Sequence, residues 1–112
     1  MKRYGMVIRL RPEKVDEYVK LHAEVWPGVL ARISDCNLRN YSIFLQRLDD
    51  GRDYLFAYFE HVGADFAADM ARMAADPETQ RWWKLTEPCQ EPVGTRRQGE
   101  WWAQMREVFH HA

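Results

Sequence analysis

The sequence YGMVIRLRPEKVDEYVKLH, residues 4–22, changes its hydrophobic period at Pro12. Before Pro12, every second residue from Tyr4 to Leu10 is apolar, a pattern typical of a half-buried strand. After Pro12, apolar residues recur every three or four positions, as they do on one face of a helix. The segment therefore predicts a strand followed directly by an amphipathic helix.

The predicted helix carries a phenol and an imidazole one turn apart, Tyr18 and His22. It begins at Pro12 with Glu13 close behind, and both residues are favourable at a helix start. Pro27 lies inside the same pattern, where a proline removes a donor and crowds the preceding turn. We therefore predict one helix of about five turns, kinked at Pro27. Its apolar stripe consists of Val15, Tyr18, His22, Val25, Val29 and Ile33.

The middle of the chain predicts a hairpin and two helices. Alternating residues 41–46 and 54–59 flank the turn sequence DDG, which favours a β-hairpin. Helix formers predict a helix over residues 65–75, and a second helical stretch runs over residues 76–85. We place His61 in the loop between the hairpin and these helices.

The last quarter of the chain is predicted as a loop and a strand. Residues 88–99 hold two prolines and two glycines, which indicates a loop or lid, and residues 101–109 are taken as the final strand. The resulting order is typical of the α+β ferredoxin-like fold, a split βαβ with one antiparallel sheet and helices on one face. The other face is too aromatic to leave in water, so a second subunit or a ligand should cover it. The residues assigned to that face are Tyr4, Tyr41, Tyr54 or Tyr58, and a C-terminal Trp.

Composition narrows the class of protein. A chain of 112 residues fits a single domain, residues 1–112, whose modest core makes dimerisation a natural supplement. The 16 Lys and Arg balance 17 Asp and Glu without a basic stripe, which disfavours nucleic-acid binding. The N-terminus lacks the apolar core of a signal peptide and no window reaches membrane-spanning length, so we expect a cytoplasmic protein. Cys36 and Cys89 have no metal-ligand spacing and predict reduced thiols.

The residues alone leave two interpretations of His22 open. An imidazole in an apolar stripe is either a satisfied core histidine or a catalytic acid or base. Trp82 and Trp83 also have two interpretations. An indole face can stack on the C–H face of a sugar, but adjacent residues point about 100° apart on a helix, so the pair can equally be one core ring and one interface ring. Tyr41 is equally suited to core or pocket. The Trp101-Trp102 pair indicates strand packing, and His110-His111 lies in a tail with no assigned function.

Four segments of the sequence form a specific combination: YVKLH leading to VWP at 18–27, NYSI at 40–43, QRWWK at 80–84 and EVFH at 107–110. Taken together, they resemble the L-rhamnose mutarotase family. The resemblance implies a homodimer of ferredoxin-like subunits, of the dimeric α/β barrel type, with each active site between the sheet and the first helix. It implies His22 as the general acid/base, Tyr18, Tyr41, Trp82 and Trp83 as sugar-binding residues, and no metal or cofactor.

The resemblance implies mutarotation, the interconversion of the α and β pyranose anomers of a 6-deoxy-L-hexose. The reaction needs one group to remove the anomeric hydroxyl proton and another to protonate the ring oxygen, and an imidazole with a phenol suffices. Rhamnose-specific members carry a Pro-Asp-Asn-type run after the Trp-Trp helix, whereas residues 87–102 here read EPCQEPVGTRRQGEWW. Because such loops set specificity, L-fucose rivals L-rhamnose as the substrate, and the altered segment favours it slightly.

Two other functions remain open at this level. One is a cofactor-independent monooxygenase or haem-degrading protein, because dimeric ferredoxin-like domains include such enzymes. The other is a non-catalytic module that binds a sugar in an aromatic pocket without turning it over. Anomer exchange separates both from a mutarotase.

Overall fold

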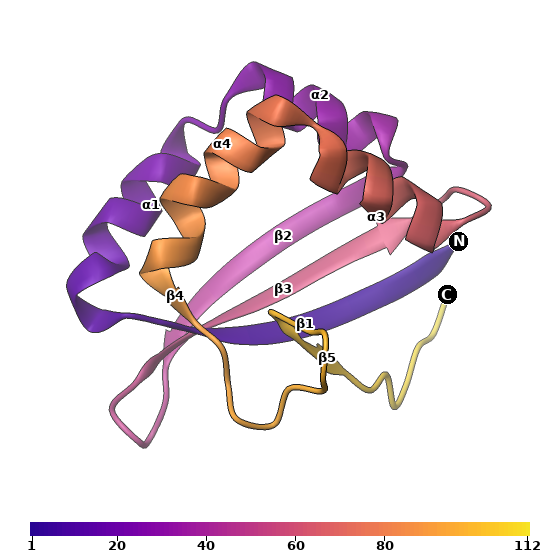
Figure 1. Ribbon diagram of the computed structural model, residues 1–112. Coiled ribbons are helices and arrows are strands. Elements are labelled where there is room, and N and C mark those ends of the chain that lie inside the picture. The colour runs from indigo at the N-terminus through magenta and orange to yellow at the C-terminus, as the bar shows by residue number, and fades with distance from the viewer.

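The sheet is built around its central strand, β3 (Asp53–His61). In the structure, a computed structural model that describes residues 1–112, β3 pairs antiparallel with β1 (Lys2–Leu10) on one side and β2 (Leu38–Arg47) on the other (Figure 1). The strand order β2-β3-β1-β4, with all helices on one face of the sheet, confirms the predicted ferredoxin-like arrangement. The alternating patterns located these strands, and pairing extends each of them beyond its predicted ends.

The sheet edge beside β1 differs from the prediction. The strand predicted over 101–109 is only β5 (Ala103–Met105), and β4 (Gln90–Glu91) lies inside the predicted loop 88–99. β4 pairs with the end of β1 and β5 with its middle, so two fragments share one edge and residues 92–102 make an excursion between them. A strand of two or three residues has no hydrophobic period, which is why the sequence pattern missed β4 and made β5 too long.

The first predicted helix is two helices rather than one kinked helix. A 3-10 turn, η1 (Pro12–Lys14), leads into α1 (Val15–Ala23), and α2 (Pro27–Asp35) follows after a break. Trp26 is extended, with φ −60° and ψ 135°, because the residue before a proline avoids the helical region. Pro27 therefore starts a helix, where its missing N–H costs nothing, instead of bending one.

The two later helices begin as predicted. Asp65 caps α3 (Phe66–Ala75) and Asp76 caps α4 (Pro77–Thr86), each accepting from a backbone N–H three residues later at 3.0 Å. Such caps satisfy orphan donors of the first turn and place a negative charge at the positive end of the helix dipole. A 3-10 turn, η2 (Glu87–Cys89), ends the second helix and leads into β4. None of the helices is long and apolar enough to cross a membrane.

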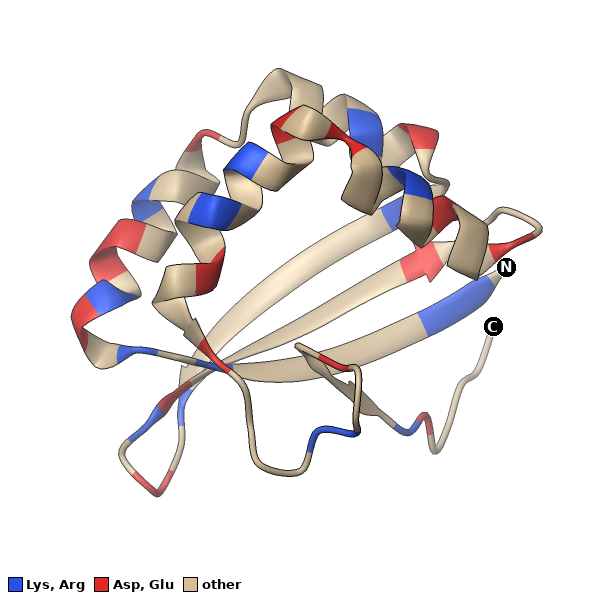
Figure 2. Cartoon of the chain, viewed as in Figure 1, with Lys and Arg blue, Asp and Glu red and all other residues tan.

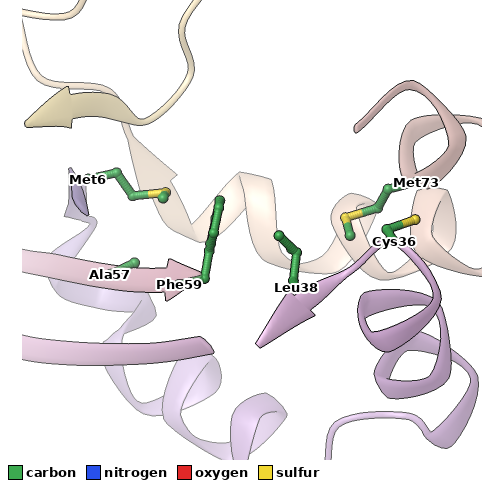
Figure 3. Packing of buried hydrophobic residues seen from close by; sticks show 6 residues of the cluster. All are labelled: Met6, Cys36, Leu38, Ala57, Phe59 and Met73. Atoms are coloured by element: carbon green, nitrogen blue, oxygen red, sulfur yellow. The ribbon is translucent and has the colours of Figure 1, made fainter. Parts of the chain in front are cut away.

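The core lies between the sheet and the helices (Figure 3). Charged residues lie mainly on the helices, the turns and the strand ends, which leaves the centre of the sheet apolar (Figure 2). A second buried cluster, beside α1, contains Tyr18 together with Ile8 and Leu55. The predicted site residue Tyr18 is thus itself part of the core. The first cluster consists of Met6, Cys36, Leu38, Ala57, Phe59 and Met73.

Tyr4 and Tyr41 do not lie on the second face of the sheet, as the sequence had predicted. Tyr4 stacks on Phe66 of α3 with ring centroids 4.3 Å apart, and Tyr41 meets the edge of Phe59 at 5.2 Å. Both rings therefore face the helices. Tyr41 faces the helices because β2 has a β-bulge beside Asn40, which has a φ of 53°. The bulge shifts the alternation of inward and outward side chains along β2 by one residue.

The second face carries Tyr54, as predicted, and other aromatic residues that were not predicted there. Val7, Phe56 and Phe44 lie in one row across the three long strands, and Phe44 is 63% exposed. Tyr54 also lies on this face, in a small buried cluster with Val93. The row leaves an apolar surface of the sheet open to solvent.

His61 is not in a loop but is the last residue of β3, where it is 4% exposed. Its Nε2–H donates to Oδ2 of Asp69 at 2.7 Å, and Asp69 also accepts from Asn37 at 2.9 Å and Arg72 at 3.0 Å. These donors lower the pKa of Asp69 to about 2, the bond from Asn37 most strongly. Gly63 leaves the room for this network, because a Cβ there would lie 2.6 Å from Asp69 Oδ2.

Candidate active site

An apolar pocket of about 160 Å³ lies between α1 and the sheet. Its volume suits a small ligand, since sites for drug-sized molecules enclose roughly 300 Å³ or more. One wall is the inner face of α1 and the other is formed by β2 and β3. The lining residues are Tyr18, Val19, His22, Ile43, Leu45 and Leu55.

His22 presents one free ring nitrogen. Its Nδ1 lies 3.0 Å from the backbone oxygen of Tyr18, and a carbonyl can only accept, so Nδ1 carries the proton. Nε2 is then left with its lone pair. Burial lowers the pKa of His22, against a smaller opposite effect of the bond to Tyr18. The imidazole is therefore neutral near pH 7 and able to take a proton.

Aromatic contacts hold the imidazole in place. The ring of Tyr18 stacks on His22 with centroids 4.2 Å apart, and Trp82 of α4 meets His22 edge-on at 5.4 Å. Trp26 in turn meets Trp82 at 5.1 Å. Sequence reasoning gave Trp26 no role, although the Trp-Pro pair at the helix break was a visible signal. The structure thus brings three predicted residues, Tyr18, His22 and Trp82, into direct contact.

Tyr18 keeps its proton. The side chain is 4% exposed, and burial raises its pKa well above the ordinary value of a phenol, while a hydrogen bond from Gln90 lowers it by less. That bond runs from Gln90 Nε2 to the Tyr18 hydroxyl at 3.3 Å. The sequence analysis missed Gln90 because it lies in the predicted loop, where no periodicity indicates the direction of a side chain.

Tyr41 and Trp83 contact the adjoining core rather than His22. Trp83 packs against the cluster that contains Met6 and Phe59, and Tyr41 lies edge-on to Phe59. Tyr41 is also 38% exposed, so it lies at the margin of that core. Adjacent tryptophans on α4 therefore have different neighbours, as their angular separation predicted.

A larger hollow on the second face contains none of the predicted site residues. It encloses about 410 Å³ beside Arg9, Tyr54 and Phe56. Its one charged lining residue is Arg9, which donates to the Tyr54 hydroxyl at 3.4 Å. The pocket beside α1 is smaller but is lined by His22, which has a ring nitrogen without a partner, so we take it as the candidate active site. No three His, Cys, Asp or Glu side chains are grouped so that they could hold a metal ion.

Comparison with known proteins connects this pocket to one family. A family model described as L-rhamnose mutarotase matches residues 3–111. The L-rhamnose mutarotase of Oceanobacillus iheyensis is 34% identical over 98% of each chain, and that of Lactiplantibacillus plantarum is 33% identical over 98% of each chain. These matches cover every residue of the pocket.

Two solved structures share the fold. An L-rhamnose mutarotase from Formosa agariphila has a TM-score of 0.73 at 20% identity, over 100% of both chains. Tetracenomycin F2 cyclase from Streptomyces glaucescens, a type-II polyketide cyclase, has a TM-score of 0.67 at 16% identity, again over 100% of both chains. Two different activities on one fold mean that the chemistry has to be argued from the site.

Proposed function

The chain belongs to the L-rhamnose mutarotase family and is an isomerase, and we propose that its pocket beside α1 interconverts the pyranose anomers of a 6-deoxy-L-hexose. The observation that carries the proposal is the state of His22. Its Nδ1–H is held by a backbone carbonyl, so a neutral Nε2 with a free lone pair lies at an apolar, aromatic pocket. A neutral base of this kind matches the proton transfers of mutarotation.

In this mechanism His22 moves one proton between two oxygens of the sugar. Nε2 takes the proton of the anomeric hydroxyl, the C1–O5 bond breaks with its electron pair going to O5, and C1 becomes an aldehyde carbon. The imidazolium then gives its proton to O5. Both oxygens are bonded to C1, so one imidazole reaches each in turn. Rotation about C1–C2 and the reverse steps close the ring as the other anomer.

The aromatic residues position the sugar. Because its raised pKa keeps the Tyr18 phenol protonated, it serves as a hydrogen-bond donor to a sugar oxygen rather than as a source of protons. Trp82 lies against His22 and offers its ring to the C–H face of the sugar. We assign Tyr41 and Trp83 to the same binding role on the strength of the family resemblance, although their present contacts are with the neighbouring core.

L-rhamnose is the first candidate substrate, because the relatives that match nearly the full chain are named L-rhamnose mutarotase. L-fucose is the alternative suggested by residues 87–102. The two sugars share the C5 methyl group and the anomeric centre, and they differ at C2 and C4. Polar groups beside those carbons would discriminate between them by leaving a hydroxyl unpaired.

We further propose a homodimer that covers the second face of the sheet. The exposed row that includes Phe44 and Phe56 supports this, because an open aromatic surface on a small protein is typical of an interface. Two buried and unpaired thiols, Cys36 and Cys89, suit the reducing cytoplasm.

Exchange spectroscopy tests the proposed reaction. A small amount of the protein is added to L-rhamnose, and NMR magnetisation transfer between its α and β anomeric protons should then far exceed that of a protein-free sample. The same measurement with L-fucose ranks the two sugars as substrates. A sugar that raises the melting temperature without any added exchange would identify a non-catalytic binding module and contradict the proposal.

A further inference from the structure

A chain of two hydrogen bonds links the excursion 92–102 to the proposed active site. The indole Nε1–H of Trp101 donates to Gln90 Oε1 at 2.7 Å, and Gln90 Nε2 donates to the Tyr18 hydroxyl at 3.3 Å. Gln90 is 5% exposed. The mechanism described above uses Tyr18 but gives no role to the other two side chains.

Trp101 determines the donor and acceptor at each of these two hydrogen bonds. An indole N–H can only donate, so the oxygen of the Gln90 amide must face Trp101 and the NH₂ group must face Tyr18. The flipped amide would set two donors against each other. The Tyr18 oxygen therefore accepts from the protein, and its single proton is left to point elsewhere.

Gln90 is held rigidly enough to enforce this direction. It belongs to β4, where it pairs with Leu10, and the preceding Cys89 accepts from the backbone N–H of Arg11 at 2.8 Å. A buried amide with both ends bonded has one low-energy rotamer.

The other end of the chain is also anchored. Glu100 accepts from the backbone N–H of Arg97 at 3.0 Å and of Gln104 at 3.4 Å, which ties down the residue before Trp101. The guanidinium of Arg96 lies over the Trp101 ring at 5.8 Å. The excursion 92–102 thus reaches the active site through the indole N–H of Trp101 and the amide of Gln90.

We propose that Gln90 is a positioning residue of the mutarotase site, clamped by Trp101, that makes the Tyr18 hydroxyl an acceptor toward the protein and a donor toward the sugar. The inference rests on the proposed function, because it assigns Gln90 a part in that same site.

Gln90→Glu tests the direction of the bond with almost no change of shape. A carboxylate still accepts from Trp101, but it also accepts from Tyr18 and draws the phenol proton away from the sugar. We expect kcat/KM for anomer exchange to fall about tenfold, the value of one hydrogen bond. Gln98→Glu is the control, because it adds the same charge at an exposed position of the same excursion and should leave kcat/KM unchanged.

The indole N–H resonance of Trp101 separates positioning from mere structural damage. It is identified by its absence in Trp101→Phe, and it should remain at its hydrogen-bonded shift in Gln90→Glu while activity falls. Wild-type kcat/KM in a Gln90→Glu protein that keeps this resonance would overturn the proposal.

Trp101→Phe provides a second test that does not depend on the folding of Gln90→Glu. It keeps the ring but frees the amide to flip, so we expect a loss of about threefold in kcat/KM, part of one hydrogen bond. An unchanged kcat/KM in Trp101→Phe would contradict the proposal that Trp101 holds the Gln90 amide in one orientation. Lack of exchange in the wild-type protein would instead contradict the mutarotase function itself, so the two failures are distinguishable.

Discussion

His22 and His61 lie toward opposite ends of the sheet and differ in what surrounds them. His61 is buried and bonded to Asp69, whose remaining capacity is taken by Asn37 and Arg72. His22 has one backbone partner and otherwise aromatic and aliphatic neighbours. The difference teaches that burial alone does not identify a catalytic imidazole. The useful sign is a ring nitrogen left without a partner at a pocket.

Removing the imidazole of His22 should have the largest effect on activity. His22→Ala deletes the proposed proton carrier, and general acid–base groups contribute about 10²- to 10⁴-fold to rate. We expect anomer exchange to fall by that range with the protein still folded. His110→Ala removes an exposed tail histidine and serves as the control. Full exchange in His22→Ala would contradict the role assigned to this residue.

His61→Ala should reverse the pattern, with a loss of stability and no direct loss of chemistry. It deletes a bond to a charged group and leaves a cavity, which together cost about 2–4 kcal/mol of unfolding free energy. Thermal or urea unfolding measures the loss. The folded fraction should still exchange anomers at nearly the wild-type rate, and a specific loss of kcat would show that the two regions are coupled.

Gly63→Ala should perturb the His61 network by a smaller amount. The new Cβ would lie 2.6 Å from Asp69 Oδ2 and 2.7 Å from Asn37 Nδ2, so the network must shift, at about 1–3 kcal/mol. Gly94→Ala is the matched control, since a Cβ there meets nothing within 4 Å. Equal unfolding midpoints for the two variants would show that the His61 network can shift to accommodate the new Cβ without loss of stability.

Acid should act on the two regions at different pH values. Burial lowers the pKa of His22 below the 6.5 that is usual for a histidine, so exchange should be constant above that pH and fall only as the pH drops through the lowered value. Asp69 has a pKa of about 2 against 3.8, so its stabilisation is complete above 3.8 and is lost between 3.8 and 2. The two losses follow the titration of different groups, so the fall in exchange and the loss of stability should have separate midpoints. A pH–rate profile beside acid unfolding measures both, and coincident midpoints would contradict the comparison.

The sequence correctly predicted those parts of the fold in which a hydrophobic period repeats several times along the chain. The alternation ending at Leu10 and the three-to-four spacing through Tyr18 and His22 each repeat several times, so tertiary contacts could not easily override them. Position Pro27 was ambiguous, because the same proline can bend a helix or begin one. The choice depends on Trp26, whose extended backbone is seen only in the structure.

The candidate site divides in the same way. That Tyr18 and His22 share a helix face follows from their spacing of four residues, a local geometry of the chain. The family resemblance added Trp82, and the structure placed it against His22. Gln90 was beyond prediction, because it meets Tyr18 from 72 residues away in the chain.

By itself, then, the sequence determined the order of the main strands and helices, the shared face of Tyr18 and His22, and the family. Only the tertiary structure decided the two-fragment sheet edge, the burial of His61 and the contact of Gln90 with Tyr18. The physical reason is the distance along the chain over which each feature is set. Periodicity records which side of its own element a residue occupies, whereas hydrogen bonds between distant segments depend on how the elements pack, and no local pattern encodes that packing.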